Sequence, residues 1–417
     1  MFLYNLGIHF FNFGLHLASS FKPKAKLWVN GRKNWREELQ QSVNKLQLED
    51  AVWIHCASLG EFEQGRPVIE KLRSIHPNQK IVLTFFSPSG FEIQKKYAQV
   101  DYVCYLPVDT KSNARDFLEI VKPKVAIFVK YEFWLNFLFQ LKDRNIPTFL
   151  ISTVIKKHQS FFKWYGGNFR KALRTYHTIY TQDNQSLDLL HQLQINTGQL
   201  AGDTRFDRVL EIGVAPSKHE SINQFMKDSF VIIAGSSWQK DEDVLIEAYL
   251  KLKPLYSNIK LIFAPHEIDL PNIERLKKQL QTKQISCDLF TEQKVPFQSS
   301  VLILDTMGML SSIYQYGNVA FIGGGFNNGI HNLLEPSVFG LPVLFGPNHQ
   351  KFNEANELIN LKAGFEIAND DDFVKFLTRF LTNEDYLKAT STISRNYVVS
   401  KSGGTAKIIE GLNPYFN

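Results

Sequence analysis

Short apolar runs alternate with helical patterns along most of the chain, and this alternation constrains the fold more than any other feature. In the first half, six such runs are expected to be strands: residues 51–58, 80–87, 102–107, 125–130, 148–153 and 178–182. Each run is followed by a stretch with helical spacing of its apolar residues. This pattern is typical of buried parallel strands in βαβ units.

The alternation stops in a polar stretch, residues 203–228, and then starts again. Five further strands are expected in the second half: residues 231–237, 260–266, 301–305, 318–325 and 342–347. A chain of 417 residues is too long for one ordinary domain. We therefore expect an α/β protein with two doubly wound, Rossmann-like domains, residues 21–208 and 209–417, that face a cleft. In such sheets, ligands bind beyond the carboxyl ends of the strands.

The first 20 residues carry no charged side chain, and six basic residues follow them before the first acidic residue. On a helix, Asn5, His9, Asn12 and His16 form one polar stripe, and most Phe and Leu residues lie elsewhere. The order of apolar and basic segments is the reverse of a signal peptide. A membrane span needs ~20 apolar residues, which this segment barely reaches. We expect residues 1–20 to form an amphipathic helix in the membrane interface, beside anionic lipid. An ordinary helix packed on the protein is the alternative.

Candidate metal ligands are scarce in the sequence. The three cysteines, Cys56, Cys104 and Cys287, are far apart and show neither a disulfide framework nor zinc-ligand spacing. The acidic run at residues 369–372 is expected to cap a helix. We therefore expect no metal and no other cofactor.

Two glutamates follow expected strands in the first half of the chain. Glu61 comes after one strand, with Ser58 and Gly60 in the turn before it, and Glu132 comes after another. Two carboxylates at one sheet edge suit proton transfer, because proximity and burial can raise one pKa toward the working pH. Both residues could instead complement the dipoles of two helix N-termini.

The second half contains a glycine-rich segment that begins at Gly323. A helix is expected to start near His331 and to direct its N–H groups toward an anion. Glu335, one turn further, is placed to accept hydrogen bonds from ribose hydroxyls. The small residues of segment 234–238 offer a further phosphate or carboxylate site. The glycines could instead only allow close packing, and neither a dinucleotide nor a P-loop motif is present.

Eight sequence blocks in this order resemble those of the transferases that attach 3-deoxy-D-manno-octulosonic acid (Kdo) to lipid A precursors. The blocks are 53–61 (WIHCASLGE), 132–136 (EFWLN), 202–207 (GDTRFD), 234–237 (AGSS), 265–266 (PH), 305–310 (DTMGML), 323–335 and 346–347 (GP). The hydrophobic first helix and its basic flank also fit this family. The resemblance implies a GT-B fold and covers nearly the whole chain.

The resemblance implies transfer of Kdo from CMP-Kdo to a hydroxyl of a tetraacyldisaccharide lipid A precursor, with inversion and without a metal. It implies that Glu61 is the general base, that Glu132 positions or tunes it, and that the enzyme works at the cytoplasmic face of the inner membrane. The positions that bind the donor in this family correspond here to Arg205, Ser236, His266, Met307, Gly308, Asn332 and Glu335. Arg205 replaces the usual lysine, which keeps the positive charge but changes its geometry.

Three motifs depart from the family pattern. Ala264-Pro265-His266 lacks the arginine of the usual Pro-Arg-His, Trp238 replaces a histidine, and segment 152–154 replaces Asn-Ala-Arg. These departures concern the contacts to anions and leave the base and the glycine-rich segment in place.

Segment 155–174 interleaves basic and aromatic residues, a mixture that suits an anionic lipid or a nucleic acid. Beside the first helix it favours lipid, so we expect no nucleic-acid partner, and an ordinary amphipathic helix fits equally well. Two other functions remain open for the chain. One is a GT-B transferase or epimerase that uses a UDP-sugar, and the other is a membrane-associated basic binding protein without enzymatic activity.

Overall fold

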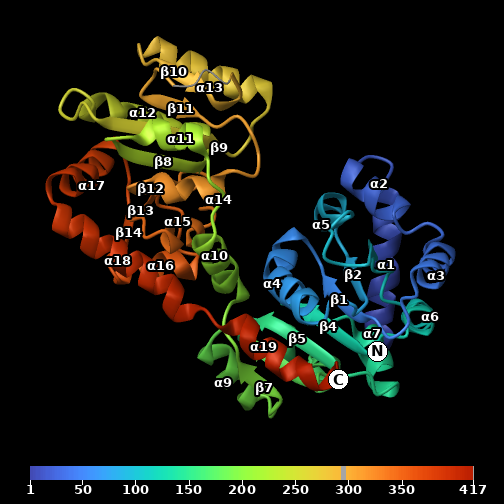
Figure 1. Cartoon of the computed structure of the whole chain (residues 1–417). Coiled ribbons are helices and arrows are strands. Elements are labelled where there is room, and N and C mark those ends of the chain that lie inside the picture. Colours follow the sequence, from blue (N-terminus) through green and yellow to red (C-terminus); the bar gives the residue numbers. More distant parts are fainter. Residues whose placement is uncertain (293–296, 417) are drawn as a thin grey trace. The chain divides into compact units, whose positions relative to one another are not determined.

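The computed structural model describes residues 1–292 and 297–416, which form two compact α/β units (Figure 1). Each unit is built on a parallel sheet of seven strands. All eleven strands expected from the sequence are present, with ends shifted by a few residues. The prediction of two parallel-sheet α/β domains is therefore confirmed.

The chain returns to the first unit at its end. The first unit contains Met1–Asp207 and Ser402–Asn417, and the second contains Arg208–Lys401. The sequence analysis grouped all of residues 209–417 together. Helix α19 (Gly404–Leu412) packs against a helix of the first unit, and the Asp207 carboxylate accepts a hydrogen bond from the Thr405 N–H at 2.7 Å.

The sheet of the first unit has the strand order β3-β2-β1-β4-β5-β6-β7. Its strands are β1 (Val52–Cys56), β2 (Ile81–Phe85), β3 (Tyr102–Tyr105), β4 (Val125–Val129), β5 (Thr148–Thr153), β6 (Thr178–Thr181) and β7 (Gly198–Leu200). The central strands are buried along their whole length, as their continuous apolar runs require. The order reverses between β1 and β4, which makes their carboxyl ends the topological switch point of the sheet.

Helices cover this sheet, and most begin directly after a strand. They are α1 (Phe2–Ala18), α2 (Pro23–Asn30), α3 (Trp35–Leu46), α4 (Leu59–Ile75), α5 (Pro88–Gln94), α6 (Lys111–Val121), α7 (Leu135–Asp143), α8 (Gly167–Leu173), α9 (Asn184–Gln192) and α10 (Thr204–Val214). Segment 155–174 is not one helix, because the short 3-10 turn Ser160–Phe162 precedes α8.

The second unit repeats the arrangement with the strand order β10-β11-β9-β8-β12-β13-β14. Its strands are β8 (Phe230–Ser237), β9 (Ile259–Pro265), β10 (Cys287–Leu289), β11 (Val301–Ile303), β12 (Val319–Ile322), β13 (Val343–Phe345) and β14 (Gly364–Glu366). Its helices are α11 (Glu220–Met226), α12 (Gln239–Leu252), α13 (Leu270–Thr282), α14 (Leu310–Ile313), α15 (Leu334–Val338), α16 (Asn353–Asn360), α17 (Asp370–Thr382) and α18 (Glu384–Lys401). Asn369 caps α17, as predicted, by accepting a hydrogen bond from the Asp372 N–H.

Helix α1 is joined to the first unit by its polar side. The Tyr4 hydroxyl donates to Asp109 Oδ2 at 2.5 Å, and the Asn136 amide donates to Asn5 Oδ1 at 2.9 Å. Asp109 also accepts the N–H groups of Asn136 and Phe137 at 3.1 and 3.0 Å, so it caps the start of α7. This buried carboxylate therefore connects α1 to the segment that begins α7, and burial raises its pKa to about 6.

The apolar side of α1 is turned away from the first unit. None of its residues is buried, and Phe2 and Leu3 are more than three-quarters exposed. Phe10, Phe13 and Leu17 are each more than half exposed. An ordinary amphipathic helix packs in the opposite sense, with its apolar stripe against the core. Within residues 1–292 and 297–416, no helix has both the length and the apolar character needed to cross a bilayer.

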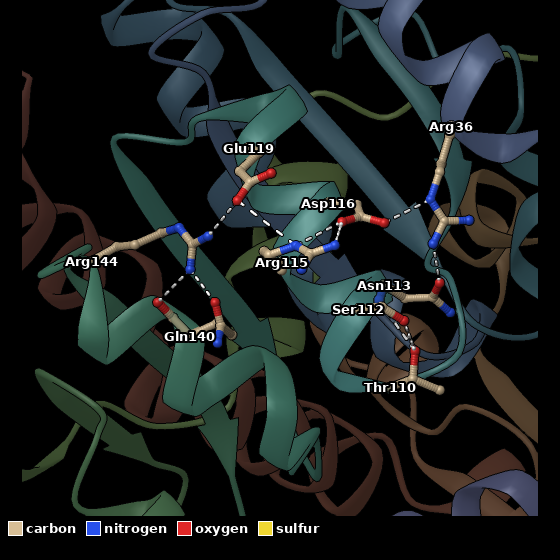
Figure 2. Close-up of polar contacts among 9 residues, drawn as sticks. All are labelled: Arg36, Thr110, Ser112, Asn113, Arg115, Asp116, Glu119, Gln140 and Arg144. Carbon is tan, nitrogen blue, oxygen red and sulfur yellow. Dashed lines mark hydrogen bonds and ion pairs between the residues drawn. The ribbon is translucent and has the colours of Figure 1, made fainter.

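Figure 2 shows an exposed ion-pair network that links α3, α6 and α7. Asp116 lies 2.8 Å from the guanidinium groups of both Arg36 and Arg115. Glu119 continues the network to Arg144 at 3.4 Å. Such solvated pairs contribute little to stability compared with the buried contacts of Asp109.

We expect Tyr4→Phe to destabilise the first unit by ~1–3 kcal/mol, because it removes a donor from a buried carboxylate. Urea unfolding followed by circular dichroism measures this loss. Arg36→Gln, in the exposed network, is the matched control and should cost clearly less. An equal loss of unfolding free energy in the two variants would show that the Tyr4–Asp109 hydrogen bond is worth no more than an exposed ion pair.

Candidate active site

Glu61 lies in the first turn of α4, just beyond the carboxyl end of β1. Ser58 is the N-cap of this helix in an extended conformation, and its hydroxyl donates a hydrogen bond to Glu61 Oε2. Glu61 is partly exposed, so its carboxylate is accessible to a substrate. Its position also fits the helix-dipole alternative, because the first turn of a helix favours negative charge.

Gly60 has a different role from the one expected. It lies inside the first turn of α4, and a methyl group built on it would meet only Ser58 Oγ, at 3.7 Å. Its backbone therefore does not require glycine, and it belongs to the helix rather than to the turn before it. The absence of a side chain leaves open surface beside Glu61.

Glu132 lies in the loop between β4 and α7 and is almost completely buried. Its Oε2 lies 3.1 Å from His55 Nε2, and the indole N–H of Trp134 also donates to it. Because α7 begins only at Leu135, Glu132 is not a carboxylate in the first turn of a helix. The helix-dipole alternative is therefore wrong for Glu132.

The two glutamates follow the two strands that meet at the switch point of the sheet, Glu61 after β1 and Glu132 after β4. Burial raises the pKa of the Cys56 thiol at the end of β1, and the charges of Glu61 and Glu132 raise it further. The structure thus places both carboxylates at one edge of the sheet, where the sequence analysis expected them.

Arg205 is the predicted donor-binding residue that belongs to the first unit. It lies in the first turn of α10, half-exposed, and its guanidinium group bonds Asp203 at 2.6 and 2.9 Å. The cation is thus held in place beside a carboxylate.

The predicted donor-binding residues of the second unit follow its strands. Ser236 lies near the end of β8 in a left-handed conformation, with a φ of 52°, and His266 follows β9 directly. Met307 and Gly308 lie between β11 and α14, and Met307 is 74% exposed. Beyond β12, the Asn332 amide donates to Glu335 Oε1 at 3.0 Å.

The glycine-rich segment after β12 is a tightly packed loop. A methyl group on Gly323 would lie 2.2 Å from the Ser236 carbonyl oxygen, so the loop and the end of β8 touch through their backbones. The buried Asp241 carboxylate accepts the N–H groups of Gly324 at 2.8 Å and Trp238 at 2.9 Å. These glycines therefore allow close packing of the backbone, and their part in binding an anion stays a prediction. The helix expected at residues 331–332 begins only at Leu334, because Asn332 Oδ1 accepts the Leu334 N–H.

The sequence analysis missed an aromatic stack at the carboxyl ends of β8 and β9. The ring of His266 lies 4.6 Å from that of Trp238 and 4.3 Å from that of His331, nearly parallel to both. The Trp238 indole N–H donates to His331 Nε2 at 3.0 Å. Burial and the neighbouring His266 lower the pKa of His331 to about 4. The only sequence signal was that each ring follows a strand or the glycine-rich segment.

His55 and Trp134 were also missed as neighbours of Glu132. Both lie in the blocks that carried the family resemblance, and only the structure shows their contacts with the carboxylate. In the part of the chain that the structure describes, no three His, Cys, Asp or Glu side chains are grouped to hold a metal ion.

Comparison with solved structures shows a fold of the GT-B type. The UDP-GlcNAc 2-epimerase of Neisseria meningitidis superimposes with a TM-score of 0.61 at 14% identity, over 87% of this chain and 100% of that one. A glycosyltransferase from Rickettsia africae superimposes with a TM-score of 0.58 at 14% identity, over 88% and 98%. At this identity the likeness concerns the fold alone.

Comparison of sequences gives a more specific result. Residues 33–208 match the family model described as 3-deoxy-D-manno-octulosonic-acid transferase (kdotransferase). The 3-deoxy-D-manno-octulosonic acid transferase of Aquifex aeolicus is 29% identical over 343 residues, which cover 81% of this chain and 88% of that protein. The enzyme of the same name from Haemophilus influenzae is 25% identical over 376 residues and 87% of each chain. The chain is therefore similar to Kdo transferases over more than four-fifths of its length, and most of its first unit matches the model of that family.

Proposed function

We propose that this protein transfers Kdo from CMP-Kdo to a hydroxyl of a tetraacyldisaccharide lipid A precursor. The observation that carries the proposal is the pair Glu61 and Glu132 at the switch point of the first sheet. One carboxylate is accessible and bonded to Ser58, and the other is buried among donors. The reaction belongs to the synthesis of the lipopolysaccharide core.

In the proposed mechanism, Glu61 removes the proton from the acceptor hydroxyl as its oxygen attacks the anomeric carbon of Kdo. The bond from this carbon to the phosphate oxygen breaks, and CMP leaves with the electron pair. Attack from the face opposite CMP inverts the configuration. The Ser58 hydroxyl donates to one oxygen of Glu61, which leaves the second oxygen for the acceptor.

The donor brings two anionic groups, the phosphate of CMP and the Kdo carboxylate. We assign the donor as a whole to Arg205 and to residues at the strand ends of the second unit, namely Ser236, His266, Met307, Gly308, Asn332 and Glu335. His266 and Asn332 are exposed, and their ring N–H and amide group can donate hydrogen bonds to these anionic groups. The Glu335 carboxylate can accept hydrogen bonds from ribose hydroxyls. Charge on the leaving group is stabilised by these groups without a metal.

The same proposal places the protein at the cytoplasmic face of the inner membrane. Helix α1 presents its apolar side to the bilayer, and the basic run after it meets anionic headgroups. Trp164 and Tyr165 are 93% and 57% exposed and belong to the same unit. Phe169 of α8 contacts Tyr4 of α1, so this aromatic segment borders the helix.

A transferase or epimerase that uses a UDP-sugar is the second candidate. The observation in its favour is the shared fold of the UDP-GlcNAc 2-epimerase. The pair of glutamates and the similarity to Kdo transferases favour Kdo transfer, and a protein that only binds lipid needs neither carboxylate.

The first prediction from this function concerns Glu61. In detergent with EDTA, the wild-type protein should transfer Kdo from CMP-Kdo to the tetraacyl precursor. Glu61→Gln should lower kcat by ~10²–10⁴-fold, because the base is lost, and leave CMP binding unchanged. Wild-type protein that is inert with CMP-Kdo but active with a UDP-sugar would support the second candidate, and transfer that stops in EDTA would contradict metal independence.

The second prediction concerns the membrane. Replacing Phe10 and Phe13 together by serine should weaken binding to phosphatidylglycerol vesicles by at least about tenfold, because apolar area no longer enters the bilayer. Vesicle sedimentation measures the bound fraction. Leu255→Ser, at a site 71% exposed in the second unit, is the matched control. Equal binding by all three proteins would remove the interfacial role of α1.

The third prediction concerns the proton on His331. Its folded pKa of about 4 lies below the unfolded value near 6.5, so its contribution to stability is lost as the pH falls between these values. Nitrogen NMR of the labelled imidazole should show a neutral ring at pH 6. Trp238→Phe should raise the pKa by roughly one unit, because Nε2 no longer accepts the indole N–H. An unchanged pKa would show that the indole hydrogen bond does not contribute to the lowered pKa of His331.

A further inference from the structure

A chain of buried polar groups leads from the core of the first unit to Glu132. The Trp53 indole N–H donates to Thr84 Oγ1 at 2.8 Å, and Thr84 Oγ1 lies 2.9 Å from His55 Nδ1. His55 Nε2 then lies 3.1 Å from Glu132 Oε2. Trp53, Thr84 and His55 are 0% exposed. His55 therefore cannot touch a substrate, and any effect it has on catalysis must pass through Glu132.

The donors in this chain determine where the protons lie. Trp53 can only donate to Thr84, so the single hydroxyl proton of Thr84 remains for another acceptor. His55 Nδ1 is the nearer acceptor at 2.9 Å, and the Ile54 carbonyl oxygen is 3.4 Å away. If Nδ1 accepts, a neutral imidazole carries its proton on Nε2. That nitrogen then donates to the carboxylate, whereas an unprotonated Nε2 would place a lone pair against it.

The same oxygen of Glu132 receives a second donor. The Trp134 indole nitrogen lies close to Oε2 and also 3.1 Å from His55 Nε2; because Oε2 is the nearer acceptor, we assign the indole N–H to the carboxylate. Trp134 is itself packed against Phe86 with ring centroids 4.5 Å apart. Across residues 1–292 and 297–416, the hydrogen bonds of this carboxylate are made to Oε2. Oε1 is left to accept a bond from outside the protein.

We infer that His55 is a positioning residue, which holds the Glu132 carboxylate in place through its Nε2–H and leaves Oε1 to accept a hydrogen bond from a hydroxyl of the acceptor sugar. The Thr84 hydroxyl determines which tautomer His55 adopts, and the Trp134 indole donates a second hydrogen bond to Glu132 Oε2. The inference rests on the proposed function, since it gives Glu132 a place in the acceptor site beside Glu61. The inference adds His55 to the residues that serve this function, although His55 is buried and does not contact the substrate.

The test uses the full chain and two variants of His55. His55→Phe keeps the ring but removes the donor, whereas the amide of His55→Gln can reach the position of Nε2. We expect kcat/KM for the tetraacyl acceptor to fall on the order of 10- to 100-fold in His55→Phe, because a buried charged acceptor loses a donor. His55→Gln should recover most of this loss, and CMP binding should be unchanged in both. A purely structural histidine would not be rescued by glutamine, so equal loss in both variants would overturn the inference.

A spectroscopic measurement tests the same inference without turnover. Nitrogen NMR of the wild-type protein labelled at histidine should show His55 neutral with its proton on Nε2. Thr84→Val, which keeps the shape of the side chain, should shift the proton toward Nδ1. A proton on Nδ1 in the wild-type protein would overturn the inference even if Kdo transfer is found. If Kdo transfer is absent but the His55 proton is on Nε2, the proposed function is wrong, and the hydrogen bond from His55 to Glu132 is still supported.

Discussion

The pairing of β1 with β4 is the constraint on which the chemistry of the first unit depends. The two strands run parallel, with Trp53 opposite Ala126 and His55 opposite Phe128, and the strand order reverses between them. The segments that leave β1 and β4 therefore begin side by side, and they carry Glu61 and Glu132. A slip of one residue in this register would turn His55 to the other face of the sheet, away from Glu132.

The two units hold their loops by different means. In the first unit, the Trp134 indole donates to the buried Glu132 carboxylate, and the Trp53 indole donates to Thr84, which lies next to His55. In the second unit, the Asp241 carboxylate accepts backbone N–H groups of the glycine-rich loop, and the stack of Trp238, His266 and His331 lies beside the same loop. The first loop is therefore held through side chains, and the second is held through its backbone.

Much of the fold could be predicted from the sequence, because the central strands need continuous apolar runs to be buried on both faces. β7, β10 and β14 could not, since they are three residues long, lie at or near sheet edges and are defined by backbone bonds to one neighbour. The blocks that contain Glu61 and Glu132 were recognised from their places after strands. Their partners were not, because His55, Thr84 and Trp134 come from three separate segments that only the sheet register brings together. The start of α15 was predicted too early, because the Asn332 side chain accepts the Leu334 N–H in a turn that precedes the helix.

The contact of Tyr4 and Asn5 with the start of α7 has a consequence for how such a protein is handled. Removal of the first 20 residues would take the phenol away from Asp109 and the amide oxygen away from Asn136. The start of α7, next to the loop that carries Glu132, would lose these two contacts, while the bonds of Glu132 to His55, Trp134 and Tyr176 would remain. Exchanging the exposed phenylalanines of α1 while keeping Tyr4 and Asn5 separates the two properties. Such variants would change the exposed apolar surface of α1 and keep the hydrogen bonds between α1 and the start of α7.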